Sequence, residues 1–465
     1  MERLEISVIN SSVCEQIVDY RIDADTYKKE YLCEEKILQK LKSKPIEEII
    51  TSIQNFGAYS LCNEINFTED GIPFLMTQNV RDNFINWDNV RHVDKRSHEL
   101  LHKSHCKKNQ VLITMAGEYL GKSAVYDKDF VCSSNQAIAK LTLKDDYYPY
   151  YVSTFINCKY GQNQISRFRT RTGQPNINMG LIKKLLIPYM SKDFSMKIER
   201  SVLEVQQILK QANNMYNEAT IILENDLGID MSSCNTSSIT TKTFSECFSK
   251  AARLDAEYFQ PKCYKVLEQL NAKETLGNLC NLYDKTFIPN DDADYQYIEL
   301  ANIGRSGEID GVEVTHGSEL PTRARRLVRK GQIIVSSVEG SIESCALITD
   351  EYDGAICSTG FYVIDSNNYN SETLLVLMKS SAIQFLLKRA CSGTILPNIS
   401  KDEFLSIPLP AIESGTQEEI KRKISEVYAY RNKGINLLET IKESVEMAIE
   451  QGEKVAIKWL DSKIK

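Results

Sequence analysis

The chain has 465 residues, of which 42% are apolar and 26% charged, and its formal net charge is −7. This length suits two to four domains with sizeable cores. No run of about 18 apolar residues is present, which excludes a membrane-spanning helix, and residues 1–10 lack the apolar stretch of a secretory signal. The negative charge argues against broad attraction to nucleic acid, but basic residues gather locally at 159–171 and 322–330.

The cysteine and histidine patterns predict neither a metal site nor disulfides. Thirteen cysteines are scattered without a C-x-x-C pair, which is typical of reduced thiols in a cytoplasmic protein. His92, His98, His102 and His105 share one segment, yet no Cys or carboxylate stands near them at a known ligand spacing. We interpret that segment as polar and partly exposed.

The first predicted elements occur twice. After a short alternating strand at 4–8, residues 21–27 open with Arg, an aliphatic residue, Asp and Ala, and residues 253–259 open in the same way. Mixed apolar and charged helices follow the two copies at 28–41 and 261–270. The two halves of the chain therefore begin alike.

Residues 46–190 read as mainly short strands between turn residues, and residues 251–410 form the second β-rich region. Buried strands are predicted at 111–115 and 333–337, with an offset of 222 residues, and glycine-containing turns follow both. Turns rich in Pro and Asn at 173–178 and 394–400 keep this offset, and short strands ending in proline close each region at 185–188 and 405–408.

Long helices are predicted at 191–227 and 415–458, because apolar residues there recur in steps of four and three, as in a coiled coil. Polar breaks at Arg431 and Gly434 indicate either register devices or a kink. Mutual packing is favoured by the shared register, and the alternative is that each helix packs only on its own β-rich region. The predicted seam consists of Ile198, Val202, Val205, Leu209, Tyr216, Leu223, Ile420, Ile424, Val427, Leu438, Ile441 and Val445.

Together these patterns predict an α+β fold with a pseudo-twofold internal repeat: two similar β-rich regions separated by two long antiparallel helices that form a coiled-coil spine. The predicted boundaries are 1–190 for the first region with its N-terminal segment 1–45, 191–227 for the first helix, 228–250 for a polar linker, 251–410 for the second region, and 411–465 for the second helix and tail.

No catalytic motif is evident in the sequence. There is no G-x-x-x-x-G-K-[ST] loop of an NTPase and no G-x-S-x-G elbow. The segment 146–150 lacks the Pro-Pro pair of an amino-methyltransferase motif. Missing motifs and a duplicated architecture favour a recognition module, with no catalytic residue and no metal.

The order of motifs resembles the specificity (S) subunit of type I restriction–modification systems. The strings that carry the resemblance are Ser392-Gly393-Thr394-Ile395-Leu396-Pro397-Asn398-Ile399-Ser400, Thr172-Gly173-Gln174-Pro175-Asn176-Ile177-Asn178, the Ile-Pro ends at Ile187-Pro188 and Ile407-Pro408, and the Arg-Ile/Leu-Asp-Ala openings. The 45-residue segment before the first region is long for the family, and Ile395-Leu396 stands where Thr-Gln is more usual.

The resemblance implies two target-recognition domains that each read half of a split site in double-stranded DNA. The helices would set the spacer and dock methyltransferase subunits, two being expected, with restriction subunits as further partners and no membrane. The subunit would be non-catalytic and without a cofactor of its own; S-adenosylmethionine, and ATP with Mg for restriction, would bind the partner subunits.

Candidate DNA contacts follow from residue type, because Arg, Asn and Gln read purine edges and Lys holds phosphates. Arg167, Arg169 and Arg171 alternate, which predicts one face of a strand. The full set of candidates is Thr77, Asn79, Arg81, Gln162, Asn163, Gln164, Arg167, Arg169, Arg171, Asn302, Arg305, Arg323, Arg325, Arg326, Lys388 and Arg389.

Two other functions fit the same sequence. One is a single-chain or type II-like modification enzyme component, which would itself bind S-adenosylmethionine. The other is a coiled-coil adaptor whose β-rich regions bind proteins, and strong salt dependence of DNA affinity would argue against it.

Overall fold

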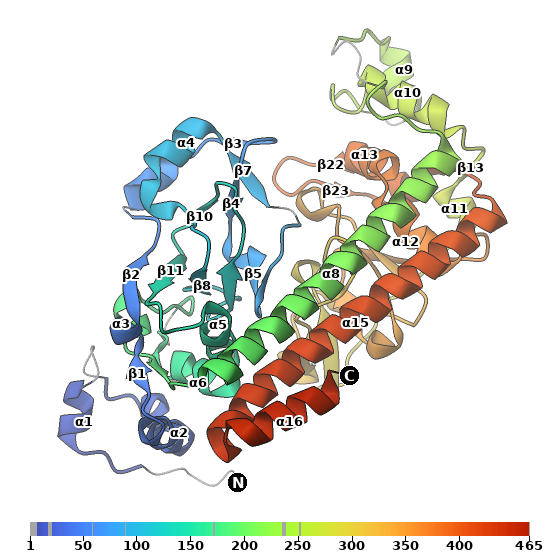
Figure 1. The fold of residues 1–465 in the computed structure, drawn as a ribbon. Helices are drawn as coiled ribbons and strands as arrows, with labels where there is room; N and C mark the ends of the chain where they lie inside the picture. Colours follow the sequence, from blue (N-terminus) through green and yellow to red (C-terminus); the bar gives the residue numbers. More distant parts are fainter. Residues whose placement is uncertain are drawn as a thin grey trace. The chain divides into compact units, whose positions relative to one another are not determined.

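The computed structural model describes residues 7–16, 21–57, 59–88, 90–170, 173–234, 239–250 and 253–464 (Figure 1). The chain divides into two compact units, one formed by Met1–Leu209 with Asn432–Lys465 and the other by Lys210–Arg431. Two long helices, α8 (Lys192–Leu227) and α15 (Ser414–Gln451), therefore contribute one half to each unit. The strand predicted at 4–8 lies mainly outside the described residues.

The first unit contains two four-stranded sheets with the orders β2-β11-β8-β9 and β10-β4-β7-β3. The first sheet is antiparallel, whereas β10 and β4 of the second are parallel. Two-stranded pairs β1-β12 and β5-β6 complete the unit. Its strands are β1 (Lys44–Pro45), β2 (Ile50–Gln54), β3 (Phe67–Thr68), β4 (Ile72–Leu75), β5 (Val80–Arg81), β6 (Phe84–Ile85), β7 (Arg91–Val93), β8 (Gln110–Thr114), β9 (Ser123–Tyr126), β10 (Ser133–Ser134), β11 (Ile138–Leu143) and β12 (Leu186–Ile187).

The second unit repeats the order of the first sheet, and its other four-stranded sheet also contains one parallel pair but in a different strand order. Its larger sheets have the orders β14-β21-β18-β19 and β16-β15-β20-β17, and β15 and β20 form the parallel pair. Two-stranded pairs β13-β24 and β22-β23 accompany them. Its strands are β13 (Glu274–Thr275), β14 (Cys280–Leu282), β15 (Asp294–Ile298), β16 (Glu313–His316), β17 (Ala324–Leu327), β18 (Ile333–Ser336), β19 (Cys345–Leu347), β20 (Ile356–Ser358), β21 (Phe361–Ser366), β22 (Cys391–Ser392), β23 (Asn398–Ile399) and β24 (Pro408–Leu409).

The predicted buried strands at 111–115 and 333–337 are confirmed as β8 and β18, and every residue of both strands is buried. Each lies between two neighbours in its sheet, so both of its edges are paired. The equivalent positions of β8 and β18 confirm the internal repeat that the constant offset predicts.

Helices also recur in the same order. Before α8 the first unit has α1 (Ser11–Gln16), α2 (Lys29–Lys40), α3 (Ile46–Ile49), α4 (Lys95–Leu100), α5 (Pro149–Asn157), α6 (Lys159–Phe168) and α7 (Met179–Ile182), and it ends with α16 (Glu453–Lys463). The second unit has α9 (Phe244–Lys250), α10 (Pro261–Leu270), α11 (Leu276–Leu279), α12 (Ser371–Lys379), α13 (Ser381–Ala390) and α14 (Lys401–Leu405). The 3₁₀ turns are η1 (Ala24–Tyr27), η2 (Tyr59–Glu64), η3 (Thr77–Asn79), η4 (His102–Ser104), η5 (Leu300–Asn302), η6 (Gly317–Glu319), η7 (Glu339–Ser341) and η8 (Asp350–Tyr352).

The strand predicted around Arg167 is wrong, because residues 159–168 form α6. Tyr160 and Ile165 of this helix are buried in the core of the first unit. Gly161 allows α6 to approach the end of α5 closely, since a Cβ there would lie 2.3 Å from the Phe155 carbonyl oxygen. Alternation of three arginines is a weak strand signal, and packing of the apolar side chains against α5 overrides it.

The predicted seam packs within each unit. In the first unit Ile198, Val202 and Val205 of α8 share a core with Leu438, Ile441 and Val445 of α15, and Leu209 is half-buried beside them. In the second unit Tyr216 and Leu223 share a core with Ile420, Ile424 and Val427. The first half of α8 thus lies with the second half of α15, so the two helices run antiparallel (Figure 1).

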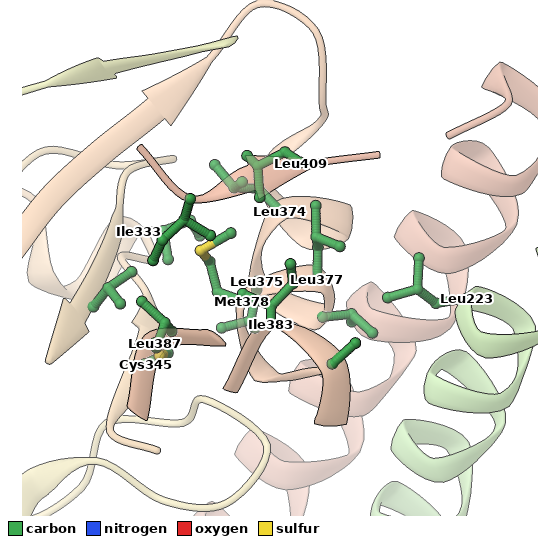
Figure 2. Packing of buried hydrophobic residues seen from close by; sticks show 14 of the residues in the cluster. Leu223, Ile333, Cys345, Leu374, Leu375, Leu377, Met378, Ile383, Leu387 and Leu409 are labelled. Carbon is green, nitrogen blue, oxygen red and sulfur yellow. The ribbon is translucent and has the colours of Figure 1, made fainter. Parts of the chain in front are cut away.

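Both predicted kinds of packing occur, because the seam residues also belong to the cores of the β-rich regions. Figure 2 shows Leu223 of α8 beside a cluster from the second region that includes Leu377 of α12 and Ile383 of α13. The long helices are therefore part of the core of each unit. Burial of their apolar side chains against each other and against the β-rich regions contributes to their stability.

The second long helix ends earlier than predicted. α15 stops at Gln451, and Gly452 adopts φ of +93° before α16 begins. This left-handed conformation favours glycine. Leu460 and Ala456 of α16 are fully buried in the core of the first unit. No helix within the described ranges is long and apolar enough to cross a membrane.

Candidate nucleic-acid interface

The amides predicted at 162–164 all make contacts within the first unit. Gln162 Nε2 donates hydrogen bonds to the carbonyls of Gly121 and Ile156, at 3.0 and 2.8 Å. Gln164 pairs with both backbone groups of Leu186, and Asn163 donates to the Glu34 carboxylate at 3.0 Å. These hydrogen bonds hold α6 against its neighbours, and a role in DNA contact stays a prediction.

Arg167 is buried and helps to bind the N-terminal segment to α6. Its Nε donates to the Thr26 carbonyl at 2.9 Å, and its guanidinium lies 3.1 Å from the Glu35 carboxylate. In return, Arg21 donates to the carbonyls of Phe168 and Arg169 at the end of α6. Cationic groups at the carboxyl end of a helix satisfy its free carbonyls.

The second repeat builds the same clamp. Arg389 Nε donates to the Tyr258 carbonyl at 2.8 Å and its guanidinium lies 4.0 Å from the Tyr258 ring centroid. Arg253 donates to the carbonyls that end α13, including Cys391 at 2.8 Å. Lys388, which precedes Arg389, is exposed. The paired openings of the two repeats, Arg21 and Arg253, therefore have the same structural role.

Arg169 is half-buried, and Arg171 lies outside the described residues. The described backbone of Arg169 accepts from Arg21 at 2.9 Å and leaves α6 as its C-terminal cap. Arg167 and Arg169 therefore do not share the face of a strand.

Asn79 and Asn302 shape equivalent turns at η3 and η5. The Asn79 side chain accepts from the Met76 amide and donates to the Asn86 carbonyl. Asn302 accepts from the Glu299 amide at 2.7 Å and donates to two later carbonyls. Both are buried, whereas Thr77 of η3 is half-buried. The two asparagines thus organise the turns that follow them.

An arginine follows each of these two asparagines within three residues. Arg81 ends β5, and its guanidinium lies 4.0 Å from the ring centroid of Tyr119. Arg305 is exposed between Gly304 and Ser306 in the second unit. A guanidinium held on an aromatic ring is restrained yet keeps its outer edge for hydrogen bonding.

Carboxylates offset much of the basic cluster at 322–330. Arg323 lies 3.0 Å from Glu299, Arg329 3.9 Å from Asp353, and Lys330 2.7 Å from Asp350. Arg325 and Arg326 lie half-buried on β17. Exposed ion pairs of this kind are weak and readily exchanged, so the cluster remains able to meet a phosphate backbone, but with less net charge than its sequence indicates.

The sequence did not identify the carboxylates that fix the two turns. In the first unit Asp82 lies 2.9 Å from Lys122 and 3.0 Å from Lys442 of α15. In the second unit Glu308 lies 2.7 Å from Arg431 of α15. The only sequence feature that pointed to these contacts was the polar residue Arg431 in the heptad seam. It marks a polar contact between α15 and the β-rich region.

The histidine segment is partly buried. The rings of His98 and His105 stack with centroids 3.8 Å apart, and His98 Nδ1 lies 2.8 Å from Ser133 Oγ. Burial and the neighbouring His105 lower the pKa of His98. Over the described part of the chain, no group of three or more His, Cys, Asp or Glu residues is arranged to hold a metal ion.

The fold defines the chain as a duplicated α+β protein in which two β-rich regions are built onto one pair of long antiparallel helices. Residues 270–447 match the family described as "Type I restriction modification DNA specificity domain". The matched residues cover most of the second β-rich region and most of α15, and the predicted resemblance to the type I specificity subunit is confirmed as a resemblance.

Comparisons with individual proteins found the following similarities. The chain is 29% identical over 109 residues to the type I restriction enzyme EcoDI specificity subunit of Escherichia coli, an alignment that spans 23% of this chain and 24% of that protein. A type I restriction–modification S subunit from M. genitalium is 14% identical, with 90% of this chain and 95% of that one covered and a TM-score of 0.33. The HsdS subunit from Thermoanaerobacter tengcongensis is 12% identical, with 91% and 96% covered and a TM-score of 0.27.

Proposed function

We propose that this chain is the non-catalytic subunit that gives a type I restriction–modification complex its DNA specificity. Each β-rich region reads one half of a bipartite site in double-stranded DNA. The observation that carries the proposal is the match of 270–447 to the specificity-domain family, together with the recurrence of one four-stranded sheet order in both units. The duplicated clamps of Arg21 and Arg253 support two equivalent readers.

The paired helices set the distance between the two half-sites. α8 has 36 residues and α15 has 38, so each is roughly 55 Å long at 1.5 Å per residue. Half-sites one turn of B-DNA apart are separated by about 34–36 Å. The helices are longer than this separation, and their length would define the non-specific spacer.

Methyltransferase subunits, two in number, bind this chain in the cytoplasm and supply S-adenosylmethionine chemistry. Restriction subunits that use ATP and Mg are further partners. The support is the family to which residues 270–447 are matched. In this arrangement the present chain contributes DNA recognition and orientation, and every reacting group lies on a partner subunit.

The decisive test is methylome sequencing of cells with and without this gene, with the gene restored as the control. Methylation should disappear at one motif made of two short half-sites and a fixed spacer, and it should return on complementation. An unchanged methylome would contradict the proposal.

Two binding measurements separate the rival functions. The isolated chain should not bind radiolabelled S-adenosylmethionine, and binding would favour a modification enzyme. Its DNA affinity should fall steeply with salt, with a slope that counts released counterions. Absence of DNA binding at low salt would favour a protein-binding adaptor.

A further inference from the structure

Each unit presents a tight turn to the helix α15. In the first unit the turn joins β5 to β6, and Asn83 within it has φ of +63°. In the second unit the turn lies at 304–308, and Gly307 has φ of +80°. The turns follow η3 and η5 and are therefore equivalent in the repeat.

The first turn is fixed by two lysines that share one carboxylate. Asp82 Oδ1 lies 2.9 Å from Lys122 Nζ, and Asp82 Oδ2 lies 3.0 Å from Lys442 Nζ. The side chain of Lys442 is 12% exposed and that of Asp82 is 19% exposed. Gln206 of α8 adds a hydrogen bond of 2.8 Å to the Asn83 carbonyl. Neither α15 nor the turn can shift without separating largely buried charges.

The second turn is fixed by a single arginine. Arg431 donates one hydrogen bond to Glu308 at 2.7 Å and two more, each 2.6 Å long, to Ser306 Oγ and Asn213 Oδ1. Tyr428, at the repeat position of Gln206, donates to the Gly307 carbonyl at 3.0 Å. A planar guanidinium with several partners fixes orientation as well as distance.

The same chemistry thus serves both units: the turn supplies a carboxylate and α15 supplies the cation. The cations are not at equivalent repeat positions, because both stand on α15, whereas the residues that the repeat offset pairs with them, Leu209 and Thr220, stand on α8. The two contacts therefore use non-equivalent residues of α15, and each lies within one unit.

We propose that Lys442 and Arg431 are positioning residues for sequence recognition, each governing one half of the DNA site. This proposal rests on the proposed function. The two turns carry Arg81 and Arg305, and α15 fixes the backbone from which these arginines project. The helix that sets the spacer would in this way also set the orientation of each β-rich region's DNA-contacting side chains.

The test uses the full chain assembled with its methyltransferase subunits and a library of DNA sites with single changes in either half. Lys442→Gln should reduce discrimination, roughly tenfold, at positions read by the first unit only, and Arg431→Gln should do so for the other half, because one well-made base contact is worth about that much. Lys442→Arg should largely restore it, whereas Arg431→Lys should restore it only in part, because an ammonium group cannot reproduce the planar set of hydrogen bonds. Lys433→Gln, an exposed lysine on the same helix, is the matched control.

Three results are diagnostic. Failure of the wild-type complex to recognise any bipartite site would overturn the proposed function itself. Unchanged discrimination in folded variants, or equal loss in both halves, would overturn the positioning role while leaving the function intact. If a glutamine variant does not fold, Asp82→Asn or Glu308→Gln replaces it with the same expectation, since each removes the charge and keeps the shape.

Discussion

Gly434 is a point of close packing between the two long helices within the first unit. A Cβ at this position would lie 2.7 Å from Leu209 Cδ2 and 3.1 Å from Leu209 Cγ. α15 continues without interruption through the glycine, so the break predicted from the heptad pattern is a point of close packing and not an end of the helix. The polar break at Arg431 has a different cause, its contact with Glu308.

Gly434→Ala should therefore destabilise the chain although alanine favours a helix. Overpacking of a filled site costs about 1–3 kcal/mol, against a gain of at most about 1 kcal/mol in helix propensity. Gly415→Ala, where nothing lies within 4 Å of the added Cβ, should be neutral or stabilising. Urea denaturation of both variants measures the difference, and equal midpoints would refute the packing argument.

The buried carboxylates predict how stability depends on pH. Burial acts to raise the pKa of Asp82 and of Glu308, but Lys122 and Lys442 outweigh it for Asp82, and Arg431 does so for Glu308. Both pKa values therefore lie below the usual 3.8 and 4.5. The stabilisation is complete above these usual values and is lost as the pH falls through the lowered pKa values.

Asp82→Asn should accordingly lower the melting temperature at pH 7 and flatten its decline below about pH 4. The comparison is a series of thermal melts from pH 7 to pH 3 on wild type and variant. Parallel curves for the two proteins would show that Asp82 does not carry the acid sensitivity.

Sequence patterns located the basic residues but not their partners. Arg167 and Arg389 belong to basic clusters, yet their Nε atoms bind carbonyls 141 and 131 residues away in sequence. Nothing local distinguishes an arginine that closes a clamp from one that reads DNA. The amides of Asn79 and Asn302 illustrate the same limit, because their capping role depends on a turn that forms only in the fold.

At the level of elements, long periodic segments were predictable and short ones were not. The heptad pattern identified both long helices, because burial of one stripe requires a regular spacing of apolar residues. α6 was missed, since its ten residues contain only a few buried positions. The orientation of α6 depends on its contacts with α5 and with the N-terminal segment. No local sequence pattern specifies these contacts.

Lengthening the two helices together tests their role as a ruler. One heptad inserted after Leu209 in α8 and another after Arg431 in α15, both in register with the seam, adds about 10 Å. The recognised spacer should grow by roughly three base pairs, since duplex DNA rises about 3.4 Å per pair. Methylome sequencing reads the spacer directly, and an unchanged spacer would refute the ruler.

The insertion in α8 alone is the matched control. It displaces the seam of one helix against the other by one heptad while leaving both β-rich regions intact. We expect this variant to lose methylation instead of changing its spacer, because the buried contacts of the two helices no longer correspond.

For the whole molecule, duplication was the strongest sequence signal, and it extends further than the resemblance suggested. The segment before the first region was regarded as long for the family. Its Arg21 clamp and α2 have counterparts in Arg253 and α10, so it is the opening of the repeat. The sequence paired the two openings, but it could not reveal the clamp, because Arg21 is separated from its carbonyl partners by nearly 150 residues.

Removal of Glu453–Lys463 should destabilise the first unit selectively. Ala456 and Leu460 are fully buried there, and Lys197 of α8 forms an ion pair with Asp461. Hydrogen exchange should quicken in β8 and β11 and stay unchanged in β18 and β21. A uniform increase in both units would contradict the assignment of α16 to the first core.

The participation of α15 and α16 in the first core also bears on biosynthesis. Residues up to 209 leave the ribosome well before Leu438, Ile441 and Leu460 are made, yet these later side chains fill the same interior. The residues translated first therefore keep an exposed apolar surface until the residues translated last are available to cover it. Nascent chains stalled before residue 432 should consequently be favoured clients of chaperones that bind exposed apolar segments.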